Sequence, residues 1–210
     1  MRFDPALVKW LATGLFVSVL SVSTTYAVHY GKGPKSASTN APGESSCQAE
    51  KCHAQNALNS GGGELAVTGI PEIYEPGKRY TLSITLLQKG QKRWGFQMTV
   101  LNEDSLPAGE FLLLEPKLTQ LKTEVAADGS VRQYVEHTLE GSHMGRKDGP
   151  ISWAVAWQAP NKPEGRVTFY TAANAANFNK KPWGDFIYTT LDTSEAPPWS
   201  GDVPGASPPD

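Results

Sequence analysis

Apolar and polar side chains alternate along most of the chain from residue 64 onward. The alternation is strictest over residues 80–86, 94–100, 131–137 and 151–157. A period of two places every second side chain on the same face, which is typical of a strand buried on one side. Each of these segments is therefore predicted to be a β-strand. Shorter strands are expected in four further apolar stretches: residues 65–67, 111–114, 167–169 and 186–190.

Turn residues separate these segments. Tyr74-Glu75-Pro76-Gly77-Lys78 places Pro and Gly where a tight turn needs them, and Asp128-Gly129-Ser130 is a hairpin signal. The chain holds 20 Gly and 16 Pro, so many turns and short strands are favoured over a helical bundle. About seven to nine short strands with little helix predict a mainly β fold, a β-sandwich.

The N-terminus has the layout of an export signal. Arg2 and Lys9 precede an apolar run over residues 10–22, and small residues lead to a cleavage position after Ala27. Residues 1–27 are thus expected to be a signal peptide, with a retained anchor helix as the alternative. No cysteine lies at the cleavage position itself, which argues against a lipoprotein.

The remaining domain boundaries follow from composition. Residues 28–45 are rich in Gly, Ser, Pro and Lys and are predicted to be a flexible linker. Residues 46–63 form a separate cysteine-containing segment, and residues 64–192 form the sandwich. Residues 193–210 are predicted to be an extended Pro/Gly-rich tail, in which Trp199 is free to dock elsewhere.

Charge and composition exclude one large class of function. A formal net charge of −2 and a pI near 6.1 argue against a nucleic-acid surface, which would carry a basic excess. Hydrophobic residues make up 39% of the chain, enough for a packed core. No phosphate-binding glycine loop, dinucleotide fingerprint or nucleophile elbow is present.

The segment Ser46-Cys47-Gln48-Ala49-Glu50-Lys51-Cys52-His53 carries the clearest chemistry. Cys47 and Cys52 are the only cysteines, and His53 follows the second directly. Two cysteines followed by histidine are the attachment signature of c-type haem, in which both thiols bond the haem and the histidine ligates the iron. The usual spacing has two residues between the cysteines, and this chain has four, so the loop must bulge.

Two alternatives remain for the cysteine pair. Two cysteines in an exported protein often form a disulfide. A Cys47–Cys52 disulfide would close a small loop. A zinc site is less favoured, because it needs about four ligands and no second cluster of such residues exists. The Gly61-Gly62-Gly63 run after a helix-compatible stretch, residues 54–58, lets the backbone pass close to a flat group, such as a haem edge, or serves as a plain linker.

Several motifs together resemble bacterial exported reeler-like domains. They occur in the same order over roughly residues 40–192, and those domains often carry a Cys-x-x-Cys-His element before the sandwich. The resemblance implies an immunoglobulin-like (reeler-like) β-sandwich with a short N-terminal haem-binding segment, and it implies no substrate. The matching motifs are Ala41-Pro42-Gly43-Glu44, the cysteine segment, Asn59 to Gly63, Tyr74-Glu75-Pro76-Gly77, Trp94-Gly95-Phe96-Gln97, Glu136-His137-Thr138, Trp157-Gln158-Ala159-Pro160, Gly165 to Tyr170 and Asn174-Ala175-Ala176-Asn177.

If haem is present, His53 is the proximal ligand and a second residue completes the iron. His137 is the first distal candidate, because it shares a strand face with Val131 and Val135 and should point to the apolar side. The alternatives are Met144 and His143 in a loop. The remaining candidates are Met98, which is expected to pack in the core, and His29.

Other clusters have ordinary explanations beside functional ones. Trp94, Trp153 and Trp157 either line a haem pocket or fill the sandwich core. A basic edge is either a solvated face or a docking site for an acidic redox partner; it comprises Lys78, Arg79, Lys89, Lys92 and Arg93.

These observations predict an exported monohaem c-type cytochrome. It would carry one covalent haem c and pass single electrons between extracytoplasmic or membrane redox proteins in the periplasm or at the cell surface. It would touch the membrane only through an uncleaved N-terminal segment, and could be a subunit of a larger complex. The main alternative is a haem-free binding or assembly module with a Cys47–Cys52 disulfide. A third possibility is a catalytic haem with an open distal position.

Overall fold

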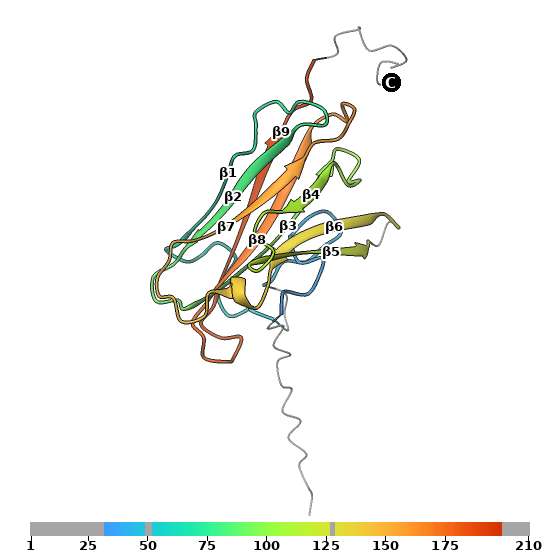
Figure 1. Ribbon diagram of the computed structural model, residues 1–210. Coiled ribbons are helices and arrows are strands. Elements are labelled where there is room, and N and C mark those ends of the chain that lie inside the picture. The colour runs from blue at the N-terminus through green and yellow to red at the C-terminus, as the bar shows by residue number, and fades with distance from the viewer. Residues whose placement is uncertain (1–31, 49–51, 127–128, 199–210) are drawn as a thin grey trace, which may run out of the picture.

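The computed structural model describes residues 32–48, 52–126 and 129–198 (Figure 1). These residues form nine strands and one short 3₁₀-helix, η1 (Glu140–Ser142). Among them, no helix is long and apolar enough to cross a membrane, and the predicted signal segment lies outside them. The strands are β1 (Glu64–Thr68), β2 (Arg79–Leu87), β3 (Arg93–Asn102), β4 (Glu110–Leu113), β5 (Thr119–Val125), β6 (Val131–His137), β7 (Ile151–Gln158), β8 (Val167–Ala176) and β9 (Phe186–Ser194).

The strands make two antiparallel sheets. One sheet has the order β1-β2-β7-β4, and the other has the order β5-β6-β3-β8-β9. The predicted mainly β sandwich is therefore confirmed. Strand β5 was not predicted, because residues 119–125 carry little apolar alternation.

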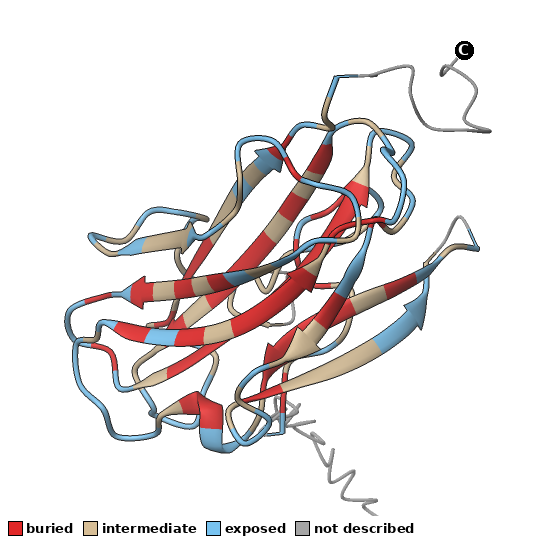
Figure 2. Ribbon diagram, turned by 45° about the horizontal axis from the view of Figure 1, so that its top comes forward, coloured by how far each residue is buried: buried red, intermediate tan, exposed pale blue. Residues whose placement is uncertain are grey.

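Buried positions alternate with more exposed positions along several strands, including β2, as the sequence predicts (Figure 2). Phe96 and Trp153 come from opposite sheets with ring centroids 4.7 Å apart, and Trp157 meets Phe169 edge-on at 4.9 Å. Each core tryptophan also donates its indole N–H to a backbone carbonyl, as Trp94 does to Arg146 at 2.8 Å. Trp94, Trp153 and Trp157 thus fill the core, since each is at most 1% exposed.

Strand β3 is buried on both faces, because a second layer covers its outer side. That layer is residues 32–48, which we call the N-terminal strap. Ser38 N–H donates to Gln97 Oε1 at 2.8 Å, and Gln97 Nε2 donates to Glu136 Oε2 at 2.7 Å. These contacts lie on the face of the five-stranded sheet opposite the core.

A buried ion pair fixes the strap. Arg132 Nη1 lies 3.0 Å from Glu44 Oε1, and both side chains are at most 3% exposed. Tyr134 donates to the same oxygen at 2.5 Å, and its burial, together with this carboxylate, raises the Tyr134 pKa. The predicted flexible linker, residues 28–45, thus differs from the structure over its described part, because polar outward residues of β6 supply it with buried partners.

The described part of the segment before β1 is irregular and contains no helix. Residues 54–58 form bends and a turn, with no helix. The glycine run packs against an aromatic side chain of β9, since a Cβ on Gly61 would lie 1.9 Å from the Tyr188 hydroxyl. Gly63 N–H also donates to that hydroxyl at 3.0 Å.

Candidate functional site

His53 contacts one residue on β8 and one residue that directly precedes β9 in the larger sheet. Its Nδ1 lies 2.7 Å from Oδ2 of Asp185, whose side chain is only 3% exposed. Its Nε2 lies 3.1 Å from Nδ2 of Asn174, on β8. A single tautomer satisfies both contacts, with Nδ1–H donating to the carboxylate and Nε2 accepting from the amide. The histidine therefore presents Nε2 toward β8.

Asp185 immediately precedes β9, and the cysteine-containing segment wraps around it. Asn56 Nδ2 donates to the Asp185 carbonyl at 2.8 Å, and Gln55 Oε1 accepts from Gly184 N–H at 2.6 Å. His53 N–H donates to the Cys47 carbonyl at 3.3 Å, which closes the cysteine loop. Residues 49–51 of that loop lie outside the described residues.

Cys47 and Cys52 both carry free, half-buried thiols. Cys47 Sγ is 3.6 Å from the Ser38 carbonyl of the strap. Burial, reinforced by the neighbouring Cys52, raises the pKa of Cys47 to about 12. A thiol with this pKa stays protonated at neutral pH.

His137 is buried at the end of β6, and its ring lies against Gly95, on the sheet face that also carries Gln97. Its Nδ1 is 3.1 Å from the amide nitrogen of Phe96 and 3.2 Å from the Phe96 carbonyl oxygen. This nitrogen is thus committed to the backbone, and Nε2 is the other ring nitrogen. Burial lowers the His137 pKa to about 4, so the ring is neutral near pH 7.

Gly95 connects the two histidines. Asn174 lies directly opposite Gly95 in the β3–β8 pair, and opposite residues project from the same face. A Cβ on Gly95 would lie 2.4 Å from Cε1 of His137, so the His137 ring occupies the place of the missing side chain. His53 contacts Asn174, and His137 contacts Gly95, at adjacent positions of one sheet. The buried Asn174 Oδ1 has no hydrogen-bond partner among the described residues.

The other distal candidates are placed differently. His143 has a left-handed backbone, with φ of 44°, and lies close enough to His137 to lower its pKa. His143 Nε2 is buried and, within the described part of the chain, has no hydrogen-bond partner. Met144 is 50% exposed, and Met98 is a fully buried core residue. His29 lies outside the described residues.

The types of residue around His53 are those that haem attachment requires. A ligating histidine usually donates its other ring N–H to a carboxylate, as His53 does to Asp185. Two free thiols adjoin it, and the buried Asn174 Oδ1 beside Nε2 is an orphaned polar atom. Within the described residues, no three His, Cys, Asp or Glu side chains gather as they would around a bare metal ion.

Sequence reasoning missed Asp185 and underrated Asn174. Asn174 stood within one of the recognised motifs but was not assigned a contact. Asp185 follows a polar loop and precedes a strand, so nothing in its sequence context distinguishes it from a turn aspartate. Only the pairing of β8 with β9 brings it to His53.

Comparison with known proteins adds little at the level of sequence. No family model matches this chain, and no curated protein matches it. Solved structures similar to it include reeler domains and cohesin modules. The Reelin-N domain of F-spondin is 22% identical with a TM-score of 0.44, covering 70% of this chain and 95% of that domain.

Two further structures have TM-scores of about the same size. The human F-spondin reeler domain is 20% identical with a TM-score of 0.41, covering 67% of this chain and 96% of that domain. A cohesin module from a Clostridium perfringens family 33 glycoside hydrolase is 11% identical with a TM-score of 0.39, covering 65% of this chain and 96% of the module.

Proposed function

We propose that this chain is an exported monohaem c-type cytochrome that exchanges single electrons with other extracytoplasmic proteins. Cys47 and Cys52 would form the two thioethers, and His53 would be the proximal ligand. The observation that carries the proposal is the 2.7 Å contact between His53 Nδ1 and the buried Asp185 carboxylate, next to two free thiols. A carboxylate that accepts from one ring nitrogen of a histidine orients the other nitrogen, as in many metal sites.

When bound, haem would supply a one-electron Fe(III)/Fe(II) couple. The chain's own residues would orient and shield it. Asp185 fixes the tautomer and direction of the His53 ring, and the strap holds Cys47 through Ser38. The Asn174 amide, now 3.1 Å from Nε2, must turn away for that nitrogen to ligate.

His137 is the proposed distal ligand. Its Nδ1 is bound to the Phe96 backbone, its ring is neutral, and it adjoins Gly95 opposite Asn174. His143 is the alternative, supported by its buried Nε2, which has no partner among the described residues. Met144 is a weaker alternative, because it is half exposed. The export signal and a periplasmic or cell-surface location remain part of this proposal.

The visible spectrum of the exported, purified protein tests the proposal. We expect a Soret band, a sharp reduced α band, and colour that stays with the protein in acid acetone. Changing Cys52 to Ser should weaken attachment, and His53→Ala should abolish the low-spin spectrum. Of the variants His137→Ala and His143→Ala, only the one that removes the distal ligand should give a high-spin spectrum. A colourless protein with a Cys47–Cys52 disulfide would support the binding-module alternative instead.

A further inference from the structure

Three loops meet at the end of the sandwich that holds His53. They are residues 88–92, 143–149 and 177–185. Gly145 N–H donates to the Lys92 carbonyl at 2.8 Å, and Gln91 Nε2 donates to the Gly184 carbonyl at 3.1 Å. Gly184 in turn contacts Gln55, two residues after His53. The three loops and residues 52–56 are therefore one continuous surface.

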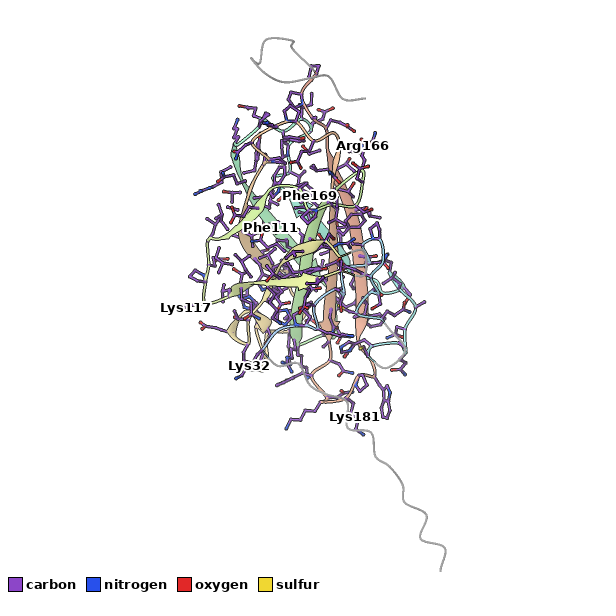
Figure 3. The ribbon with its side chains drawn as sticks, turned by 90° about the vertical axis from the view of Figure 1, so that its right-hand side faces the viewer. Lys32, Phe111, Lys117, Arg166, Phe169 and Lys181 are labelled. Carbon is purple, nitrogen blue, oxygen red and sulfur yellow. The ribbon has the colours of Figure 1, made fainter. Side chains whose placement is uncertain are left out.

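This surface, which we call the basic end, is rich in exposed cations. Figure 3 shows Lys181 at the same end as Lys32 and Lys117, with Arg166 toward the other end. The three loops carry two carboxylates: Asp185 is buried against His53, and the exposed Asp148 accepts from Gly90 N–H at 2.7 Å. The exposed basic residues on the three loops are Lys89, Lys92, Arg146, Lys147, Lys180 and Lys181.

The ion pairs found within the described residues lie mostly away from the basic end. They join His53 to Asp185, Lys78 to Glu75, Lys122 to Glu136, Arg132 to Glu44 and Arg166 to Glu195. None of them involves Lys92, Lys147 or Lys181. A local positive field thus stands out on a chain whose formal net charge is −2. The predicted basic edge is divided, because Lys78 and Arg79 lie at the opposite end of β2 from Lys89 and Lys92.

Two exposed aromatic side chains lie among these cations. Trp183 is 58% exposed and Phe178 is 39% exposed. Lys181 Nζ lies 5.3 Å from the Trp183 ring, and Arg93 lies 5.9 Å from the Phe178 ring. The loop that carries them is ordered by its own hydrogen bonds, since the side-chain amides of Asn177 and Asn179 both donate to the Trp183 carbonyl at 2.9 Å. Tryptophan on an ordered loop is typical of a binding hot spot.

We propose that the basic end docks an acidic protein, and that this protein is the electron-exchange partner. The inference rests on the proposed function, because that function places the redox group beside His53. Complementary charge would steer the partner to this end, and Trp183 would supply the apolar contact. An anionic lipid surface offers the same charges but accepts no electron, so an acidic protein is the occupant that fits the site.

Binding of labelled poly-L-glutamate to the full-length, exported protein tests this inference. The variant K92E/K147E/K181E should bind this probe at least tenfold more weakly than the wild type, and wild-type binding should weaken steeply as salt is added. The control K78E/R79E/K162E makes the same change in net charge at the opposite end. It should lose no more than twofold in binding.

Equal losses in the two variants would overturn the docking surface, as would a wild type that does not bind poly-L-glutamate. Tighter wild-type binding to phosphatidylglycerol vesicles than to poly-L-glutamate would also overturn the acidic protein partner. The visible spectrum of each sample keeps the two proposals separate. A colourless protein that still binds poly-L-glutamate through the basic end would remove the cytochrome function but leave an acidic partner.

Discussion

Asp185 is the residue on which the orientation of His53 depends. Its carboxylate is 3% exposed, so water competes little for the contact with Nδ1. A carboxylate that accepts from a ligating histidine makes the imidazole more basic and favours the oxidised metal. The contact should therefore affect the reduction potential more than the fold.

Changing Asp185 to Asn should raise the reduction potential by tens of millivolts. The amide keeps the size of the side chain but loses the charge that favours Fe(III). A tenfold change in a one-electron equilibrium corresponds to about 59 mV. Spectroelectrochemical titration measures the shift, and Asp104→Asn, in an exposed loop, is the matched control. An unchanged potential in Asp185→Asn would count against His53 as the ligand.

His137 makes the haem-free fold sensitive to acid. Burial, with help from Arg93 and Lys122, lowers its folded pKa from 6.5 to about 4. The unfolded chain binds the proton first, so stability is highest above pH 6.5 and falls as the pH drops from 6.5 toward 4. The loss amounts to about 3 kcal/mol at most.

Urea unfolding of the haem-free Cys47→Ser/Cys52→Ser protein, measured between pH 7 and pH 4, tests this dependence. Adding His137→Gln should flatten the decline, because the amide does not titrate in this range. If the decline is equally steep with glutamine, the lowered pKa of His137 is not its cause.

Gly95 and His137 are predicted to be coupled. A methyl group at position 95 would lie 2.4 Å from the imidazole ring, so Gly95→Ala should destabilise the fold by about 1–3 kcal/mol. Gly62→Ala is the control, since nothing lies within 4 Å of the added methyl, and it should change stability by less than about 0.5 kcal/mol. Combining Gly95→Ala with His137→Ala should cost less than the sum of the single changes. Additive costs in chemical denaturation would contradict the contact.

At the scale of elements, the strap joins the cysteine pair to the sandwich. Its Glu44 forms the buried ion pair with Arg132, and its Ser38 contacts both Gln97 and Cys47. Stability and thiol access are therefore linked through one short segment.

Glu44→Gln should reduce the free energy of unfolding by about 3–5 kcal/mol, because the charge of Glu44 is removed from a buried ion pair. Loosening the strap should also speed alkylation of Cys47 in the haem-free protein. Urea unfolding and the rate of iodoacetamide labelling measure the two effects. Glu110→Gln, at an exposed position of β4, should change neither. Slow labelling in Glu44→Gln would show that the strap does not protect the thiol.

The strands were predictable because alternation is a local signal. Every strand with regular apolar positions was predicted, whereas β5, which lacks them, was not. The strap was not predicted, because Glu44 and Ser38 are polar and gain burial only from partners on distant strands. Cys47, Cys52 and His53 were selected as candidates from their order in the sequence, whereas Asp185 required the β8–β9 pairing.

At the scale of the whole molecule, the candidate haem residues and the basic end lie at one end of the sandwich. The C-terminal end of the described chain emerges at the opposite end (Figure 1). This separation would leave the exchange surface open if a partner or further assembly engaged the other end. The central claim, however, is that haem is covalently attached, and it concerns only the cysteine-containing segment.

The intact mass of the exported, mature protein tests that claim most directly. The account predicts the mass of residues 28–210 plus one haem, with no alkylatable thiol remaining. A mass equal to the polypeptide less two hydrogens, with Cys47 joined to Cys52, would contradict it.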